Sequence, residues 1–148
     1  MMPLTTALIG TWELVSRADR NAAGDLRPDP TLGADPLGLL IYDRGGRFAA
    51  QFMKRDRATT PADTPTVAQS ANNTRAKDGY DAYFGTYVVD DERRTVTQTL
   101  HAALSAENVG HVVTREMAVE GDTLTISLNT TSVSGEAVTR TLRWRRVA

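Results

Sequence analysis

Apolar and polar residues alternate with a period of two along most of the chain, and turn residues interrupt this pattern about every ten positions. Such alternation is typical of strands with one buried face. Most links between the strands are as short as hairpin loops, so consecutive strands are expected to pair antiparallel. Closure of the sheet into a barrel then leaves no exposed strand edge. The prediction is all-β, an eight-stranded antiparallel up-and-down barrel with strands at Ile9–Arg17, Leu37–Asp43, Arg47–Arg55, Tyr83–Asp90, Arg94–Ser105, Gly110–Glu120, Thr123–Thr130 and Ala137–Val147.

Two segments depart from the alternation. Ala18–Pro36 is punctuated by glycines and prolines, which predicts a loop. Thr66–Asp78 has no β-branched alternation, and Pro65 suits a first helical turn. We expect one helix there, between the third and fourth strands, covering one barrel mouth.

Composition narrows the class of protein. The chain has 148 residues, which fits a single domain over 1–148, and 17 basic against 18 acidic residues give a net charge of −1. This balance predicts no nucleic-acid partner, and the absence of a long apolar run predicts no membrane partner. The chain has no cysteine, which excludes disulfides and thiolate chemistry and fits a cytoplasmic location, while a homodimer stays open.

Gly10-Thr11-Trp12 stands at the head of the first strand and resembles the Gly-x-Trp signature of lipocalins. In that fold the tryptophan plugs the closed end of the barrel, and a basic residue near the end of the last strand packs over it. The resemblance implies this role for Arg146 or Arg143.

A wider similarity, from about Leu8 to Val147, is to the bacterial lipocalin-like domain family. It implies a lipocalin-like barrel more firmly than any activity. The chain departs from the family pattern at Gln98 and Thr99, where a His-His pair is expected after Thr-Val-Thr. The similarity is carried by Asp35–Tyr42, Gly46–Arg57, Tyr80–Asp90, Thr95–Thr97, Gly121–Leu124 and Thr141–Val147.

Alternation also predicts which side chains face the interior, because neighbouring residues of a strand point to opposite faces. The third strand is ambiguous, with Phe48, Ala50 and Phe52 competing against Ala49, Gln51 and Met53. For the other strands the expected inward residues are Trp12, Leu14 and Ser16; Tyr83, Gly85, Tyr87 and Val89; Val96, Gln98, Leu100, Ala102 and Leu104; His111, Val113, Arg115, Met117 and Val119; Leu124, Ile126 and Leu128; and Val138, Arg140, Leu142 and Trp144.

Two of these residues, Arg115 and Arg140, are cations in an otherwise largely aliphatic interior. A buried guanidinium without a partner costs several kcal/mol, and no inward set contains Asp or Glu. One interpretation is that a ligand supplies the missing anion. The alternative is that the arginines stack on tryptophan or extend toward a barrel mouth.

The function predicted from these residues is binding of a small, mainly apolar ligand, with an anionic group as an option, inside the barrel. No catalytic residue is assigned, no cofactor is expected, and the two histidines on opposite faces predict no metal site. An isomerase or cyclase acting on an apolar small molecule is the alternative, and a solidly filled interaction module is a third. The expected ligand-binding residues are Arg115, Arg140, Tyr83, Tyr87, Gln51, Gln98, Leu100, Met117 and Trp144, with Leu14 and Leu142 completing the apolar lining.

Overall fold

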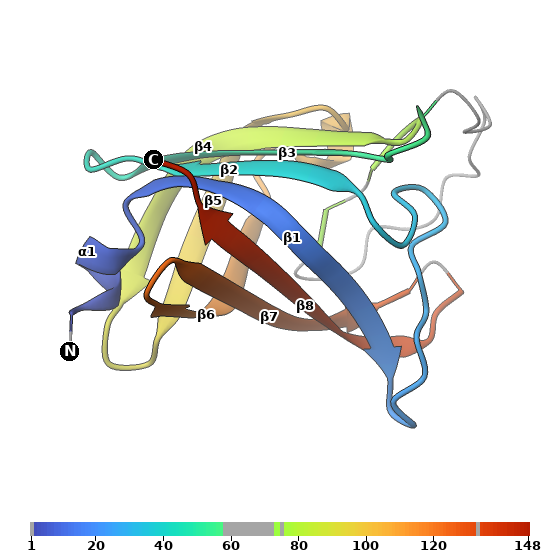
Figure 1. Ribbon diagram of the computed structural model, residues 1–148. Helices are drawn as coiled ribbons and strands as arrows, with labels where there is room; N and C mark the ends of the chain where they lie inside the picture. Colours follow the sequence, from blue (N-terminus) through green and yellow to red (C-terminus); the bar gives the residue numbers. More distant parts are fainter. Residues whose placement is uncertain (1, 58–72, 75, 133) are drawn as a thin grey trace.

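A computed structural model of the chain describes residues 2–57, 73–74, 76–132 and 134–148. Eight antiparallel strands close into a barrel in which each strand pairs with its neighbours in sequence and β1 pairs with β8 (Figure 1). The strands are β1 (Gly10–Asn21), β2 (Leu37–Tyr42), β3 (Arg47–Met53), β4 (Tyr80–Asp90), β5 (Thr95–Ala103), β6 (Val112–Glu120), β7 (Thr123–Thr131) and β8 (Ala137–Arg146). The all-β class and the eight-stranded barrel are therefore confirmed.

The helices differ from the prediction. Within the described residues the α-helix is α1 (Leu4–Ala7), followed later by the 3-10 helix η2 (Ala106–Asn108). Most of the predicted helix Thr66–Asp78 lies outside the described residues, and its described residues, 73–74 and 76–78, are not helical. The helix between β3 and β4 is thus not confirmed. None of the described helices is long and apolar enough to cross a membrane.

Trp12 closes one end of the barrel. Its side chain is fully buried, and its indole N–H donates to the carbonyl of Leu8 at 3.0 Å. The Arg146 guanidinium lies 4.2 Å from the Trp12 ring centroid and donates to the carbonyls of Ile9 and Ala7. Arg146, rather than Arg143, therefore packs over the tryptophan.

Gly10 is required for this arrangement. Its φ is 147°, and a Cβ atom there would lie 2.5 Å from Nη1 of Arg146 and 2.8 Å from the carbonyl of Ala148. The glycine of the Gly-x-Trp signature thus leaves room for the arginine that covers the tryptophan.

A bulge in β1 changes which of its side chains face inward. Leu14 pairs with Trp144, but Ser16 pairs with Arg143, so β1 has one extra residue at this point. Beyond the bulge the inward parity changes from even to odd, as expected for an inserted residue. Ser16 is exposed, and the expectation that it faces inward is wrong. Asp19 is buried instead and lies opposite Arg140.

A second bulge lies between β4 and β5, where Phe84 pairs with Ala102 and Gly85 with Leu100. A Cβ atom at Gly85 would lie 1.8 Å from the carbonyl oxygen of Thr99, so the approach of the two strands needs glycine. The extra residue shifts the parity of β5, and Leu104 is exposed rather than inward.

The remaining strands agree with the predicted faces, and β3 buries Phe48, Ala50 and Phe52. These side chains belong to one buried apolar cluster with Trp12, Trp144 and Tyr42, which are almost fully buried. The apolar core therefore extends from Trp12 at the closed end as far as Phe52, Leu128 and Leu142. A polar cavity lies toward the other end, where the strands lead into the longer loops.

Candidate functional site: a charged cavity in the barrel

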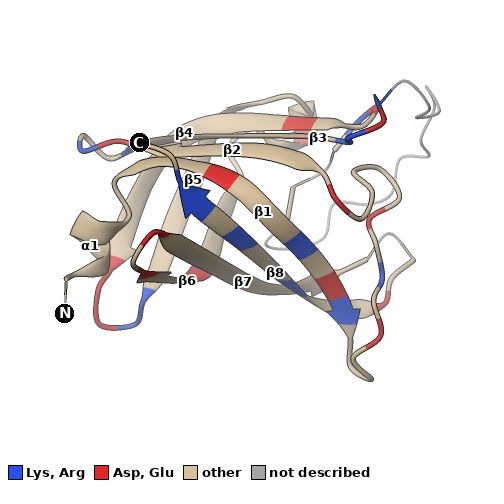
Figure 2. Cartoon of the chain, viewed as in Figure 1, with Lys and Arg blue, Asp and Glu red and all other residues tan. Residues whose placement is uncertain are grey.

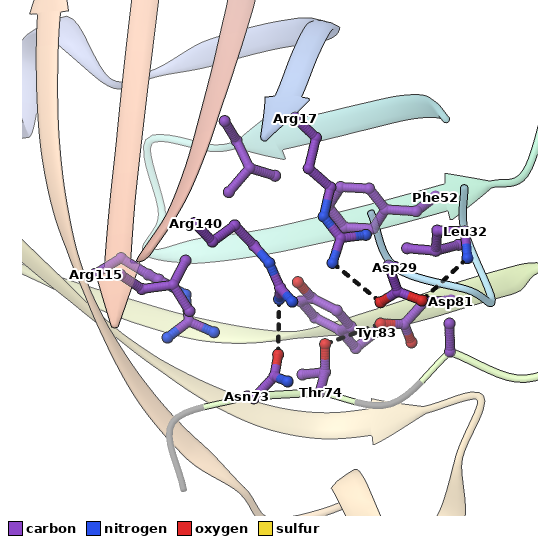
Figure 3. Close-up of a pocket in the computed structure, with 13 residues that line it drawn as sticks. Arg17, Asp29, Leu32, Phe52, Asn73, Thr74, Asp81, Tyr83, Arg115 and Arg140 are labelled. Atoms are coloured by element: carbon purple, nitrogen blue, oxygen red, sulfur yellow. Dashed lines mark hydrogen bonds and ion pairs between the residues drawn. The ribbon is translucent and has the colours of Figure 1, made fainter. Parts of the chain in front are cut away.

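A cavity of about 40 Å³ lies beyond the apolar core (Figure 3). It is partly open, and its volume corresponds to about three water molecules. Strands β1, β3, β4, β6, β7 and β8 contribute to its wall, together with residues from the loops after β1 and β3. The lining residues are Arg17, Asp29, Leu32, Phe52, Asn73, Thr74, Ala76, Asp81, Tyr83, Arg115, Leu128, Arg140 and Leu142.

Arg140 is held in a fixed orientation by three hydrogen bonds. Its Nε and Nη2 atoms donate to the two carboxylate oxygens of Asp19 at 2.9 and 3.0 Å, and its Nη1 donates to Oδ1 of Asn73 at 2.9 Å. Such a bidentate pair is the strongest geometry that arginine makes with a carboxylate. Because Asp19 is 6% exposed and Arg140 8%, both charges are buried together.

A second ion pair joins Arg17 to Asp29, from the loop after β1. Nη2 of Arg17 lies 3.2 Å from Oδ2 of Asp29, whose Oδ1 accepts the backbone N–H groups of Thr31 and Leu32. Burial raises the pKa of Asp29, but the charge of Arg17 and the Thr31 N–H outweigh it and hold that pKa below its usual value. Burial lowers the pKa of Arg17. The loop is therefore fastened onto the barrel by charge and by an Asx turn.

Charged residues from distant parts of the chain thus meet on neighbouring strands. Figure 2 shows acidic and basic bands following one another along β1, beside basic bands on β8. The bulge in β1 turns two of the charged side chains of this strand, Arg17 and Asp19, toward the interior.

Asp81 on β4 is the least compensated carboxyl group in the cavity. It is 3% exposed, Oδ2 accepts the Thr74 hydroxyl at 2.8 Å, and Oδ1 has no hydrogen-bond partner among the described residues. Burial raises the pKa of Asp81 to about 7, although the Thr74 hydroxyl, the Ala82 backbone N–H and the charge of Arg17 act in the opposite direction. The carboxyl group therefore exchanges its proton near neutral pH.

Arg115 projects into the cavity from β6 and is 7% exposed. Burial lowers the pKa of Arg115 to about 10, with Arg140 acting in the same direction and Tyr83 and Tyr42 in the opposite one. A group with this pKa is still protonated at pH 7. Burial also raises the pKa of Tyr83 to about 12, so this phenol is neutral at pH 7.

The predicted ligand-binding residues divide into three groups. Arg115, Arg140 and Tyr83 lie together on the cavity wall. Gln51 is exposed on the outer face, where its side chain accepts the Tyr80 hydroxyl at 2.7 Å, so the expectation that it faces the interior is wrong. The other five are buried in the filled part of the barrel and do not line the cavity: Tyr87, Gln98, Leu100, Met117 and Trp144.

Hydrogen bonds within the filled part satisfy the polar groups of Tyr87 and Gln98. The Tyr87 hydroxyl donates to the carbonyl of Asp43, and the Gln98 amide donates to the hydroxyl of Tyr42. Burial raises the pKa of Tyr42 well above its ordinary value. These side chains therefore stabilise the barrel rather than enclosing space.

The sequence reasoning missed the acidic residues of the cavity. Asp19 and Asp29 fell in the predicted loop Ala18–Pro36, so no alternation was applied to them. Asp81 carried a usable signal, because it shares the parity of Tyr83 once β4 is extended to its true start at Tyr80. The conclusion that no carboxylate faces the arginines is thus corrected, since Asp19 pairs with Arg140.

The closed eight-stranded barrel, plugged by a tryptophan that an arginine covers, defines a protein of the lipocalin class. Barrels of this class bind small hydrophobic molecules in general. The sequence of residues 9–147 matches the lipocalin-like domain family, and the chain belongs to that family. A comparison with curated proteins finds no match.

Proposed function

We propose that this protein binds a small, mainly apolar molecule that carries an anionic group, and that the anionic group enters the charged cavity. One observation carries the proposal: three buried guanidinium groups and four large apolar side chains line the same cavity. The guanidinium groups belong to Arg17, Arg115 and Arg140, and the apolar side chains to Leu32, Phe52, Leu128 and Leu142.

The charges that line the cavity favour an anion. With Arg17, Arg115 and Arg140 protonated and Asp29 and Asp19 ionised, protonation of Asp81 leaves these described side chains with one excess positive charge. An anion in the cavity balances that charge in a medium of low dielectric, where the attraction is stronger than in water.

Arg115 is the guanidinium best placed to bind the anion. Arg140 is engaged by Asp19 and Asn73, and Arg17 by Asp29, so moving either would break an existing ion pair. Arg115 donates to the carbonyl of Thr114 at 3.4 Å and has the hydroxyl groups of Tyr83 and Tyr42 among its electrostatic neighbours. Both phenols are neutral at pH 7 and can remain in place when a carboxylate binds.

The size of the cavity sets the form of the ligand. A volume of about 40 Å³ accommodates a carboxylate in place of about three waters. An alkyl chain attached to that carboxylate can contact apolar lining residues such as Leu32 and Phe52. Medium-chain carboxylic acids are therefore suitable probes.

The test compares hexanoate with hexan-1-ol by calorimetry at about pH 6, because only the acid offers a charge-assisted hydrogen bond to a guanidinium. We expect the acid to bind at least about tenfold more tightly and to raise the melting temperature. Arg115→Met should remove this preference, whereas Arg143→Met, on the exposed face of the same barrel, should keep it. Equal affinity for acid and alcohol in the unmodified protein would rule out the proposal.

A further inference from the structure

We propose that Oδ1 of Asp81 is a second binding point in the cavity, which in its protonated form donates a hydrogen bond to a carbonyl or carboxylate oxygen of the ligand. A consequence is that binding takes up a proton and weakens as the pH rises. The ligand class rests on the proposed function, whereas the role of Asp81 rests on its own surroundings.

The first observation is geometric. Asp81 lines the cavity, and its two oxygens have different surroundings: Oδ2 accepts the Thr74 hydroxyl, whereas Oδ1 is buried without a hydrogen-bond partner among the described residues. A buried polar atom without a partner costs about 1–3 kcal/mol, and more when it is charged. A ligand oxygen placed beside Oδ1 would complete its hydrogen bonding, provided that Asp81 carries the proton.

The second observation is the set of groups that face Asp81. Arg17 comes from β1, Asp29 from the loop after β1, and Tyr83 from β4 itself. Arg17 is already paired with Asp29, so its charge is shared between two carboxyl groups. The charge of Arg17 therefore does not outweigh the effect of burial on Asp81, and the pKa of Asp81 is raised to about 7.

The third observation is the position of Tyr83. Both Asp81 and Arg115 act electrostatically on the Tyr83 hydroxyl, and all three side chains line the same cavity. Figure 3 shows Tyr83 between the side chains of Asp81 and Arg115. The cavity therefore offers a neutral donor, protonated Asp81, on one side of the Tyr83 phenol and a cation, Arg115, on the other side. We expect the ligand to present an anionic oxygen to Arg115 and an acceptor oxygen to Asp81.

The experiment measures hexanoate binding by calorimetry at about pH 6 and about pH 8.5, where both the probe and Arg115 keep their charge. If only the protonated form of Asp81 binds, its apparent affinity falls in proportion to that form, which is about thirtyfold over this range. Calorimetry in phosphate and in Tris at about pH 8 should show uptake of nearly one proton per hexanoate bound.

The variant Asp81→Asn keeps the size of the side chain and a permanent donor. We expect it to bind hexanoate with less than about a twofold difference between the two pH values and with no proton uptake. The control Asp122→Asn, whose carboxyl group is exposed near the closed end, should keep the thirtyfold change.

The outcomes separate the two proposals. Binding of hexanoate without dependence on pH would overturn the role of Asp81 and leave the proposed function in place. If hexanoate binds at neither pH, the proposed function fails, and hexan-2-one then tests Asp81 with a neutral acceptor. If hexan-2-one binds more weakly above pH 7 and Asp81→Asn removes this dependence on pH, the role of Asp81 is supported. If hexan-2-one does not bind in this way, the role of Asp81 is overturned.

Discussion

The ion pair between Arg140 and Asp19 offers the most direct test of the cavity, because it exists only if the bulge in β1 turns Asp19 inward. Arg140→Met removes the guanidinium while keeping most of the apolar length of the side chain. The change removes two hydrogen bonds to Asp19 and one to Asn73.

The expected loss of stability follows from what remains. Breaking a buried ion pair from one side costs about 3–5 kcal/mol, because the other charge stays buried without compensation. Nε of Arg17 lies 4.0 Å from Oδ1 of Asp19 and retains part of the attraction. We therefore expect Arg140→Met to lower the free energy of unfolding by about 3 kcal/mol, a large part of the roughly 5–15 kcal/mol of a typical domain.

Urea unfolding at pH 7, followed by tryptophan fluorescence, measures this loss. Arg145→Met is the matched control, because Arg145 pairs with Glu13 at 3.6 Å on the outer face, where the two side chains are 63% and 57% exposed. Its expected cost is below about 1 kcal/mol. The double variant Asp19→Leu with Arg140→Met should recover much of the loss, because no charge then remains buried without a partner.

Equal costs for Arg140→Met and Arg145→Met would refute the reasoning. That result would mean that Asp19 is solvated and that β1 continues without its bulge. Arg140 would then have no buried carboxylate partner in Asp19.

Two further predictions concern the closed end and the buried carboxyl group. Trp12→Ala should lower the free energy of unfolding by about 3–5 kcal/mol in urea titrations, because it empties the plug beneath Arg146, and a loss below about 1 kcal/mol would contradict the plug. For Asp81, burial raises the pKa from 3.8 to about 7, so the folded state holds its proton more tightly than the unfolded state. Its contribution to stability is therefore full below about pH 4 and is lost as the pH rises through 7, by up to roughly 4 kcal/mol. Urea titrations at several pH values should show this decline relative to Asp81→Asn, and identical pH profiles would contradict it.

Local alternation was sufficient for the barrel itself. In β6, β7 and β8 the parity of apolar residues predicted the inward faces correctly, because each of these strands runs without a bulge and has one wet face. The inward positions of Arg115 and Arg140 followed from the same rule. The closed end was marked by the resemblance of Gly10-Thr11-Trp12 to the lipocalin signature rather than by alternation, and the structure places Arg146 over Trp12 there.

The tertiary structure alone decided how the cavity is charged. The extra residue in β1 reverses the parity of every position after it, and no feature of the alternation marks where a strand accepts such a residue. Asp29 and Asn73 lie outside the strands, and they belong to the cavity through their hydrogen bonds with Arg17 and Arg140. The sequence therefore determined the barrel and its inward arginines, whereas long-range pairing decided which carboxyl groups meet them, because strand register and loop docking are set by the whole closed sheet.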